Sequence, residues 1–396
     1  MDFELTDTQR RWRDEIRAFL RESVTPELER ERDLEGKLRF GPEARAFRRK
    51  VGQKGWWGLT WPKEYGGLAK GAIELHIMAS EFDYAKVVPA DTTYLSIAPM
   101  IMQYGTEENK EDFIPGITHG EFVVAVGYSE PDAGTDLASL RTRAELDGDE
   151  WVINGSKIWT SNAHGASHLW LCVRTDPNAP KHQGISVIMV PISTKGIDVQ
   201  PLICWSDYRT NQVFFTDVRV PRRNLIGEVN KGWGYITGAL TLERSAVSTG
   251  GDLRREVDDL IEVCRADLVG GVRLIERPSV QQRLAELDAD VEVALLYGLR
   301  AASLIDNGEI PTATLTSQKI YTSELRQKIA DYGMQIFGIC GQLSWRDPGA
   351  PGHGDSERLY RYAPEIRFAG GTNEVLRDII AQRGYGMPSY GRSRRS

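Results

Sequence analysis

The sequence predicts an α+β protein of three domains: an N-terminal helical domain over residues 1–120, a central β-barrel over 121–230, and a C-terminal helical domain resembling a four-helix bundle over 231–396. Two observations predict this order. Apolar residues recur at helical spacing in the first and last thirds, whereas the middle third carries short apolar runs separated by turn residues. Strands do not alternate with helices, which disfavours a doubly wound parallel sheet.

The N-terminal third is expected to begin with a helix at Thr6. Thr6 and Gln9 have the spacing of a capping box, in which each residue's side chain bonds the other's backbone N–H. Trp12, Ile16 and Leu20 follow at helical spacing. Further helices are expected near 42–54, 71–86 and 107–118.

The middle third is expected to contain several short strands. Asp147-Gly148-Asp149 has the composition of a hairpin turn between two of them. The expected strands lie near 122–126, 141–146, 151–153, 168–173, 185–191 and 212–220. Several short strands with turns between them favour a compact barrel or sandwich.

The C-terminal third returns to the helical period. Pro278 and Pro311 lie where helices can begin, because proline is tolerated in the first turn. Long helices are expected over 232–268, 279–307 and 312–337.

Composition excludes several classes of function. The formal net charge of −7 offers no basic field for nucleic acid, and no apolar run approaches the ~18 residues of a membrane span. The four cysteines lie far apart without a C-x-x-C pair, which disfavours disulfides and a thiolate zinc site and fits a reducing cytoplasm. The N-terminus has no apolar core of a signal peptide. His164 and His168 are spaced i, i+4 without a nearby carboxylate or thiol, so no metal is expected.

Two polar segments of the middle third are the strongest candidates for a binding site. One runs Tyr-Ser-Glu-Pro-Asp-Ala-Gly-Thr-Asp over 128–136, and the other Asn-Gly-Ser-Lys-Ile-Trp-Thr-Ser-Asn over 154–162. Both are rich in hydroxyls and in small residues that expose backbone N–H groups. Taken singly, each is equally typical of an ordinary polar loop of a β domain.

Taken together, the two segments resemble the flavin-binding loops of the acyl-CoA dehydrogenase family. Further matches follow in the family's order: Val-Arg-Val-Pro at 218–221, Asn-Leu-Ile-Gly at 224–227, Leu-Glu-Arg at 242–244, Gln-Ile-Phe-Gly at 335–338, Gly-Thr-Asn-Glu at 371–374 and Ile-Ala-Gln-Arg at 380–383. The resemblance spans nearly the whole chain, and the family's α–β–α order is the one that periodicity predicts.

The resemblance implies that FAD is the cofactor. Trp159 matches a residue that lies against the flavin ring, and Ser161 matches one near the ring's polar edge. A lining of hydroxyls and backbone N–H groups suits a ring that gains negative charge on reduction. The full set of expected cofactor contacts is Tyr128, Ser129, Thr135, Trp159, Thr160, Ser161, Gln335, Gly338, Thr372 and Glu374, of which Gln335 and Gly338 would reach the cofactor of a neighbouring subunit.

The catalytic base is expected at Glu243. In many members of the family a glutamate immediately precedes the C-terminal Gly-Thr, but Gly370 occupies that position here. A minority pattern, that of isovaleryl-type members, puts the base in the Leu-Glu-Arg of a long helix. Glu243 falls in an apolar stripe without a helical ion-pair partner, where burial raises proton affinity. The alternative is a structural glutamate paired with a distant arginine across a subunit contact.

The resemblance implies dehydrogenation of an acyl-CoA to a trans-2-enoyl-CoA. Glu243 would take the α-proton while the β-hydrogen leaves as hydride to the flavin, and electrons would pass to an electron-transfer flavoprotein. Two alternatives stay open: an oxygen-using oxidase or monooxygenase on the same fold, and a partner subunit that completes another chain's site. Substrate contacts are expected from Thr135, Thr241, Arg244, Gly370 and Gly371.

The acyl group and the assembly are less constrained. The missing side chain at Gly370 leaves room for a branched or ring-bearing group, and the motifs are similar to those of actinobacterial members acting on steroid side chains. The family's R-x-x-F-G segment, whose arginine reaches an adjacent subunit's flavin pyrophosphate, is absent, and Asp267 falls at the arginine position. Either Arg265 or Arg273 substitutes in a homotetramer or homodimer, or a homologous chain supplies the arginine in an α2β2 assembly.

Overall fold

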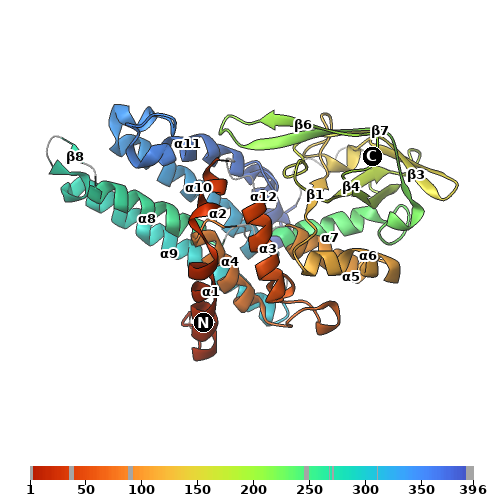
Figure 1. Ribbon diagram of the computed structural model, residues 1–396, viewed down its shortest axis with the longest axis horizontal. Helices are drawn as coiled ribbons and strands as arrows, with labels where there is room; N and C mark the ends of the chain where they lie inside the picture. The colour runs from red at the N-terminus through yellow and green to blue at the C-terminus, as the bar shows by residue number, and fades with distance from the viewer. Residues whose placement is uncertain are drawn as a thin grey trace. The chain divides into compact units, whose positions relative to one another are not determined.

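The computed structural model describes residues 3–34, 40–87, 92–244, 249–266, 268–269, 272–309 and 311–388. The chain forms two compact units (Figure 1). Met1–Glu22, Gly71–Pro89 and Arg244–Ser396 make up one, here called the helical unit. Ser23–Lys70 and Ala90–Glu243 make up the other, here called the sheet unit. The predicted order of helices, strands and helices is confirmed.

The helical unit combines two N-terminal helices with the C-terminal ones. Helix α1 (Asp7–Ser23) begins as predicted, because the Thr6 hydroxyl accepts from the Gln9 N–H at 3.3 Å and the Gln9 side chain accepts from the Thr6 N–H at 3.0 Å. Helix α4 (Ala72–Tyr84) packs against α8 and α9. The C-terminal helices are α8 (Gly251–Ala266), α9 (Pro278–Asp306), α10 (Thr312–Ile336), α11 (Asp355–Ile366) and α12 (Asn373–Ile379).

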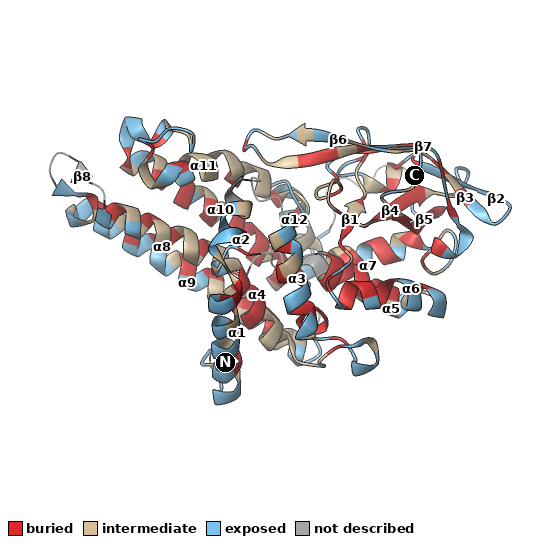
Figure 2. Ribbon diagram, in the orientation of Figure 1, coloured by how far each residue is buried: buried red, intermediate tan, exposed pale blue. Residues whose placement is uncertain are grey.

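The core of the helical unit lies between α8, α9 and α10. Leu253, Val257 and Val291 are fully buried in it, and Figure 2 shows buried residues along these helices. Proline opens α9 as predicted, and Pro311 directly precedes α10. A small hairpin of β8 (Leu268–Val269) and β9 (Val272–Arg273) follows α8.

The single helix expected over 232–268 is wrong. Helix α7 (Gly232–Arg244) belongs to the sheet unit up to Glu243, and α8 starts anew at Gly251. Gly250 has φ of 88°, a left-handed value that a continuous α-helix cannot contain. Apolar residues recur on both sides of this position, but the stripe of Leu253 and Val257 is out of phase with that of Ile236 and Leu240 at 3.6 residues per turn.

The sheet unit is built around one curled seven-stranded sheet, with path order β1-β4-β2-β3-β7-β6 and β5 paired to β4. Helices α2 (Pro26–Leu34), α3 (Pro42–Gln53), α5 (Ala98–Tyr104), α6 (Glu107–Thr118) and α7 also belong to this unit. The strands are β1 (Val124–Gly127), β2 (Arg143–Asp147), β3 (Glu150–Lys157), β4 (His168–Arg174), β5 (Ile185–Pro191), β6 (Ile197–Ile203) and β7 (Arg209–Pro221).

Most strands fall where the sequence predicts them, and the β2–β3 hairpin turns at Gly148, whose φ is 61°. Strand β6 was not predicted. It contains Pro201 and pairs only with β7, as expected of an edge strand that is mostly open to solvent. Strands β4 and β5 are almost continuously buried and carry the core of the unit.

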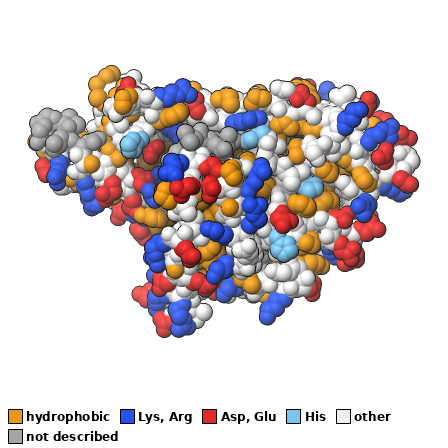
Figure 3. All heavy atoms as spheres, in the orientation of Figure 1, with side chains coloured by type: hydrophobic (Ala, Val, Ile, Leu, Met, Phe, Trp, Pro, Cys, Tyr) orange, Lys and Arg blue, Asp and Glu red, His pale blue; other side chains and the backbone are white. Residues whose placement is uncertain are grey.

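Charges are mixed over the surface. On the face shown in Figure 3, acidic and basic side chains alternate without a field of one sign. No helix in the described part of the chain is both long and apolar enough to cross a membrane.

Candidate functional site

The two polar loops singled out in the sequence lie together in the sheet unit. Lys157, at the end of β3, is fully buried and donates from Nζ to Glu130 Oε1 at 2.8 Å and to the Tyr128 carbonyl at 3.0 Å. One residue further, the Ile158 N–H donates to the Ser129 carbonyl at 2.9 Å. The loop after β1 is thereby tied to the loop after β3.

Glu130 is the centre of this connection. Its carboxylate also accepts the backbone N–H of Arg141 at 2.6 Å and of Thr142 at 2.8 Å. Burial alone would raise the pKa of Glu130, but the charge of Lys157 and the hydrogen bonds outweigh burial and hold the pKa below its usual value. A compensated, ionised pair therefore fixes the base of both loops.

Trp159 stands out from the second loop. Its backbone has φ of 57°, a left-handed value that costs an L-residue with a side chain roughly 1–2 kcal/mol. Its indole is 59% exposed, although the residue is large and apolar. Backbone strain of this kind is concentrated at sites where a side chain must be presented to a ligand. The exposed indole therefore offers a flat surface for a ligand.

The residues after Trp159 are held by strand β7. Thr160 and Asn211 exchange two hydrogen bonds of 2.9 Å, one from the Thr160 N–H and one from the Asn211 side chain. The Ser161 and Thr210 hydroxyls lie 3.2 Å apart. The Thr160 hydroxyl is buried and has no hydrogen-bond partner among the described residues. An orphaned buried hydroxyl is costly and indicates a missing polar partner.

The two histidines weighed as metal ligands have other roles. His164 contacts the Asn211 side chain at 3.1 Å, and His168 contacts the Ser167 hydroxyl at 2.9 Å. Burial lowers the pKa of His168 to about 4. Within the described ranges, no group of three or more His, Cys, Asp or Glu side chains could hold a metal.

The other candidates of the sheet unit are less constrained. Thr135 is exposed to solvent. Thr241 is half-buried in α7, and its hydroxyl donates to the Thr237 carbonyl one turn earlier at 2.8 Å. Glu243 and Arg244 form the last turn of α7, but their side chains lie outside what the structure describes.

A second group of candidates lies in the helical unit, between α11 and α12. Gly370 and Gly371 have φ of 68° and 101°, and a Cβ at Gly370 would meet nothing within 4 Å. The Thr372 hydroxyl caps α12 by accepting the Val375 N–H at 3.2 Å. Glu374 is exposed and lies 3.7 Å from Arg367. Gly370 is thus an open position in a left-handed turn.

Two further candidates follow the end of α10. Gln335 is exposed and donates to Asp331 at 2.7 Å. Gly338 has φ of 56°, and a Cβ there would also meet nothing within 4 Å. The candidates thus form one group in the sheet unit and another in the helical unit.

Sequence reasoning missed the buried polar residues that hold these loops. On β3, Lys157 lies an even number of positions from Trp151 and Ile153 and is buried as they are. On α10, Lys319 lies one turn after Leu315, and both are buried. The signal that could have identified both lysines is a charged residue at a position where the strand or helix otherwise carries core residues. The partners of Lys157 and Lys319 come from distant segments, so no spacing in the sequence identifies them.

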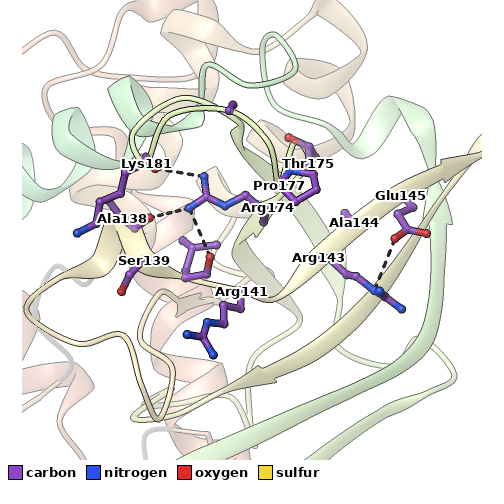
Figure 4. A pocket seen from close by; sticks show the side chains of 12 residues that line it. Ala138, Ser139, Arg141, Arg143, Ala144, Glu145, Arg174, Thr175, Pro177 and Lys181 are labelled. Carbon is purple, nitrogen blue, oxygen red and sulfur yellow. Dashed lines mark hydrogen bonds and ion pairs between the residues drawn. The ribbon is translucent and has the colours of Figure 1, made fainter.

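The sheet unit also contains a cavity of about 560 Å³. It lies between the segment 138–145 and the loop that follows β4, and its lining carries three arginines and a lysine against one glutamate (Figure 4). Arg174 joins its two walls by donating to four backbone carbonyls, those of Ala138, Leu140, Lys181 and Gln183. Arg174 is hydrogen-bonded to carbonyls, and the charges of Glu130 and Asp176 act on it electrostatically.

Comparison with known proteins assigns the family. Profiles of the acyl-CoA dehydrogenase N-terminal, middle and C-terminal domains match residues 6–121, 125–218 and 230–385. Acyl-CoA dehydrogenase FadE26 of Mycobacterium tuberculosis is 38% identical over 99% of this chain and 100% of its own. The chain belongs to the acyl-CoA dehydrogenase family. It is therefore an oxidoreductase of a flavoprotein family that acts in fatty acid or steroid metabolism.

Two solved structures of this acyl-CoA dehydrogenase family are similar over 98% of this chain and 100% of theirs. One is titled Tcur3481-Tcur3483 steroid ACAD and the other is the ChsE4-ChsE5 complex from Mycobacterium tuberculosis. Each has a TM-score of 0.89 and 38% sequence identity to the chain. The three-domain fold is thereby established.

Proposed function

We propose that this chain is an FAD-dependent acyl-CoA dehydrogenase that forms a trans-2-enoyl-CoA and passes electrons to an electron-transfer flavoprotein. The proposal rests on two neighbouring residues. Trp159 is exposed and has a left-handed backbone, and the buried hydroxyl of Thr160, next in the chain, has no hydrogen-bond partner among the described residues. A flat ring with polar edges, such as isoalloxazine, would cover the indole and satisfy the hydroxyl. FAD, when bound, accepts the hydride from the substrate's β-carbon.

The remaining expected contacts suit the same cofactor. Ser129 lies in the loop fixed by Glu130, and Ser161 lies beside Thr210, so hydroxyls flank Trp159 on both loops. In the helical unit, the open positions at Gly338 and Gly370 leave the backbone accessible to a ligand. Thr372 and Glu374 would complete the cofactor contacts.

Glu243 is proposed as the base that takes the α-proton. Ala239 and Leu240 precede it by one helical turn, and they are buried and half-buried. An apolar setting raises the proton affinity of a carboxylate, as abstraction of an α-proton requires. Gly370 cannot provide a base, and Arg244 and Thr241 are proposed to contact the substrate with Thr135 and Gly371.

The cationic cavity is proposed to hold the phosphate-bearing end of coenzyme A. Arg141 is exposed at its rim, and Lys181, which pairs with Asp136, lies on the opposite loop. Arginine and lysine side chains are the usual partners of phosphate groups. Anchoring the nucleotide there would leave the thioester end free to reach the loops.

The test is anaerobic reduction of the purified protein. The wild type is expected to carry FAD and to be bleached by its best acyl-CoA, whereas Glu243→Gln should keep FAD and lose reduction by orders of magnitude. Glu228→Gln, at an exposed residue shortly before α7, is the matched control. Undiminished reduction in Glu243→Gln would remove Glu243 from the mechanism, and a colourless chain without FAD would favour a partner-subunit role.

The electron acceptor and the acyl group need separate measurements. Turnover with an artificial acceptor but not with oxygen is expected, and the reverse would indicate an oxidase or monooxygenase. A branched or steroid acyl-CoA is the proposed substrate, because Gly370 leaves space and a structural relative is named a steroid enzyme. A clear optimum on straight chains would contradict this.

The assembly is proposed to include a homologous chain. Asp267 lies at the family's arginine position and outside the described residues, and both structural relatives are named as pairs of polypeptides. Arg265 is exposed and already pairs with Glu262, and Arg273 is exposed. A homo-oligomer with one FAD per chain would instead assign the role to Arg265 or Arg273. None of the four cysteines forms a disulfide, which suits action in the cytoplasm.

A further inference from the structure

A buried lysine holds the glycine loop of the helical unit. Lys319, in the second turn of α10, is only 4% exposed. Its Nζ donates to the carbonyls of Arg367 at 3.1 Å and Gly371 at 2.9 Å, and to the Asn373 side-chain oxygen at 2.9 Å. An ammonium has three donors, so all three are used.

The three acceptors lie at the two ends of one short loop. Arg367 directly follows α11, and Asn373 is the first residue of α12. The Asn373 N–H also donates to the Arg367 carbonyl at 3.0 Å, which closes the loop at its base. Lys319 is therefore the point at which α10 binds the end of α11, the glycine turn and the start of α12 at once.

The glycine turn within the loop contributes little to the loop's stability. Gly370 and Gly371 adopt left-handed conformations, and glycine loses more conformational entropy on ordering than any other residue. Phe368 is 66% exposed and contributes little burial. Lys319 fixes the Gly371 carbonyl, and it holds the Arg367 carbonyl together with the Asn373 N–H.

We propose that Lys319 is a positioning residue, whose ammonium holds Gly370–Thr372 in the conformation that binds acyl-CoA and flavin. This rests on the proposed function, in which these residues contact both ligands. Lys319 acts through the loop and touches neither reacting atom. A neutral amine has only two N–H donors, so the clamp requires the protonated form.

Lys319 loses its positive charge at a lower pH than an ordinary lysine does. Burial and, to a smaller extent, the charge of Arg367 lower the pKa of Lys319 to about 8, against the opposing charges of Glu374 and Glu324. Arg377 also faces this cluster through an ion pair with Glu324 at 2.6 Å.

The test compares Lys319→Met with Lys328→Met by amide hydrogen exchange. Lys328 lies on the same helix, but its side chain is 55% exposed and pairs with Asp290. In the protein as purified, the backbone amides of residues 367–376 should exchange at least about 10-fold faster in Lys319→Met than in the wild type, whereas those of α9 should exchange at the same rate. Lys328→Met should match the wild type. Unchanged exchange over 367–376 in a folded Lys319→Met would overturn the proposal.

The wild type provides a second, independent measurement. After correction for intrinsic exchange chemistry, opening of 367–376 should increase as the pH rises through about 8, where Lys319 loses its proton. A flat profile overturns the proposal even if Lys319→Met does not fold. In active enzyme, Lys319→Met should raise the KM for acyl-CoA and weaken FAD retention more than it lowers kcat. A chain without FAD or activity would contradict the proposed function while leaving the exchange results interpretable.

Discussion

Lys157 and Glu130 form an ion pair of 2.8 Å in the sheet unit, with their side chains 0% and 8% exposed. Twenty-seven positions separate them in the sequence. Since Lys157 ends β3 and Glu130 follows β1, the pair joins strands that are not neighbours in the sheet. It fixes the loops that carry Ser129 and Trp159 at a common base.

Lys157→Met should destabilise the protein by about 3–5 kcal/mol, because it leaves the buried carboxylate of Glu130 without its counter-charge. Urea denaturation would measure the loss. The double variant Glu130→Gln/Lys157→Met should recover part of it, since no buried charge remains. As a control, Lys110→Met removes a lysine whose partner Glu107 is exposed, and should change the midpoint little. A double variant as unstable as the single one would contradict this account.

Acid should weaken the same connection. The pKa of Glu130 is held below its usual value by Lys157 and by hydrogen bonds that outweigh burial. The pair therefore contributes stability that is fully present above the unfolded-state pKa of about 4.3 and is lost as pH falls through the folded-state pKa. Urea midpoints at pH 6 and pH 3.5 should differ less in Glu130→Gln than in the wild type. Equal differences would exclude Glu130 as a source of the acid sensitivity.

Two substitutions at Trp159 should affect stability differently but cofactor binding alike. Trp159→Gly and Trp159→Ala both remove the exposed indole, but only glycine adopts φ of 57° without strain. Trp159→Gly should therefore be the more stable of the two by about 1 kcal/mol in the FAD-free protein, as measured by thermal unfolding. Both should bind FAD more weakly than the wild type. Retention of full FAD affinity in both would contradict the proposed role of Trp159.

Arg141→Ala should weaken binding of the coenzyme A nucleotide. Loss of a charge-assisted contact at the rim of the cavity is expected to raise the KM for acyl-CoA by about 10-fold. The KM for the same acyl group on a pantetheine fragment should not change, because that fragment lacks the nucleotide. Arg143→Ala is the control, since Arg143 already faces Glu145 at 3.6 Å. An equal effect on both substrates would place the phosphates elsewhere.

A substitution at Gly298 should test how closely α4, which carries His76, packs against α9. A Cβ at Gly298 would lie 2.1 Å from Cε1 of His76, a rigid ring whose pKa burial lowers to about 4. Gly298→Ala should cost roughly 1–3 kcal/mol of stability by overpacking. Gly234→Ala, on α7 with nothing within 4 Å of its Cβ, should be neutral or stabilising. Thermal unfolding of both variants would measure the contrast.

Local features of this protein could be predicted from its sequence. The capping box of Thr6 and Gln9 and the turn at Gly148 are in place because they depend on residues two or three positions apart. Short apolar runs between turn residues identified most strands for the same reason. The family motifs identified the candidate loops, although their contacts with ligands stay proposals.

The three-dimensional structure alone decided which segments meet. Helix α4 joins the C-terminal helices, and α7 and α8 belong mainly to different units although they follow each other in the sequence. The hydrogen-bond partners of Lys157 and Lys319 could not be predicted from the sequence either. Periodicity and turn chemistry report each residue's own backbone and burial, whereas a buried charge is stabilised by groups that only chain folding brings within hydrogen-bond distance.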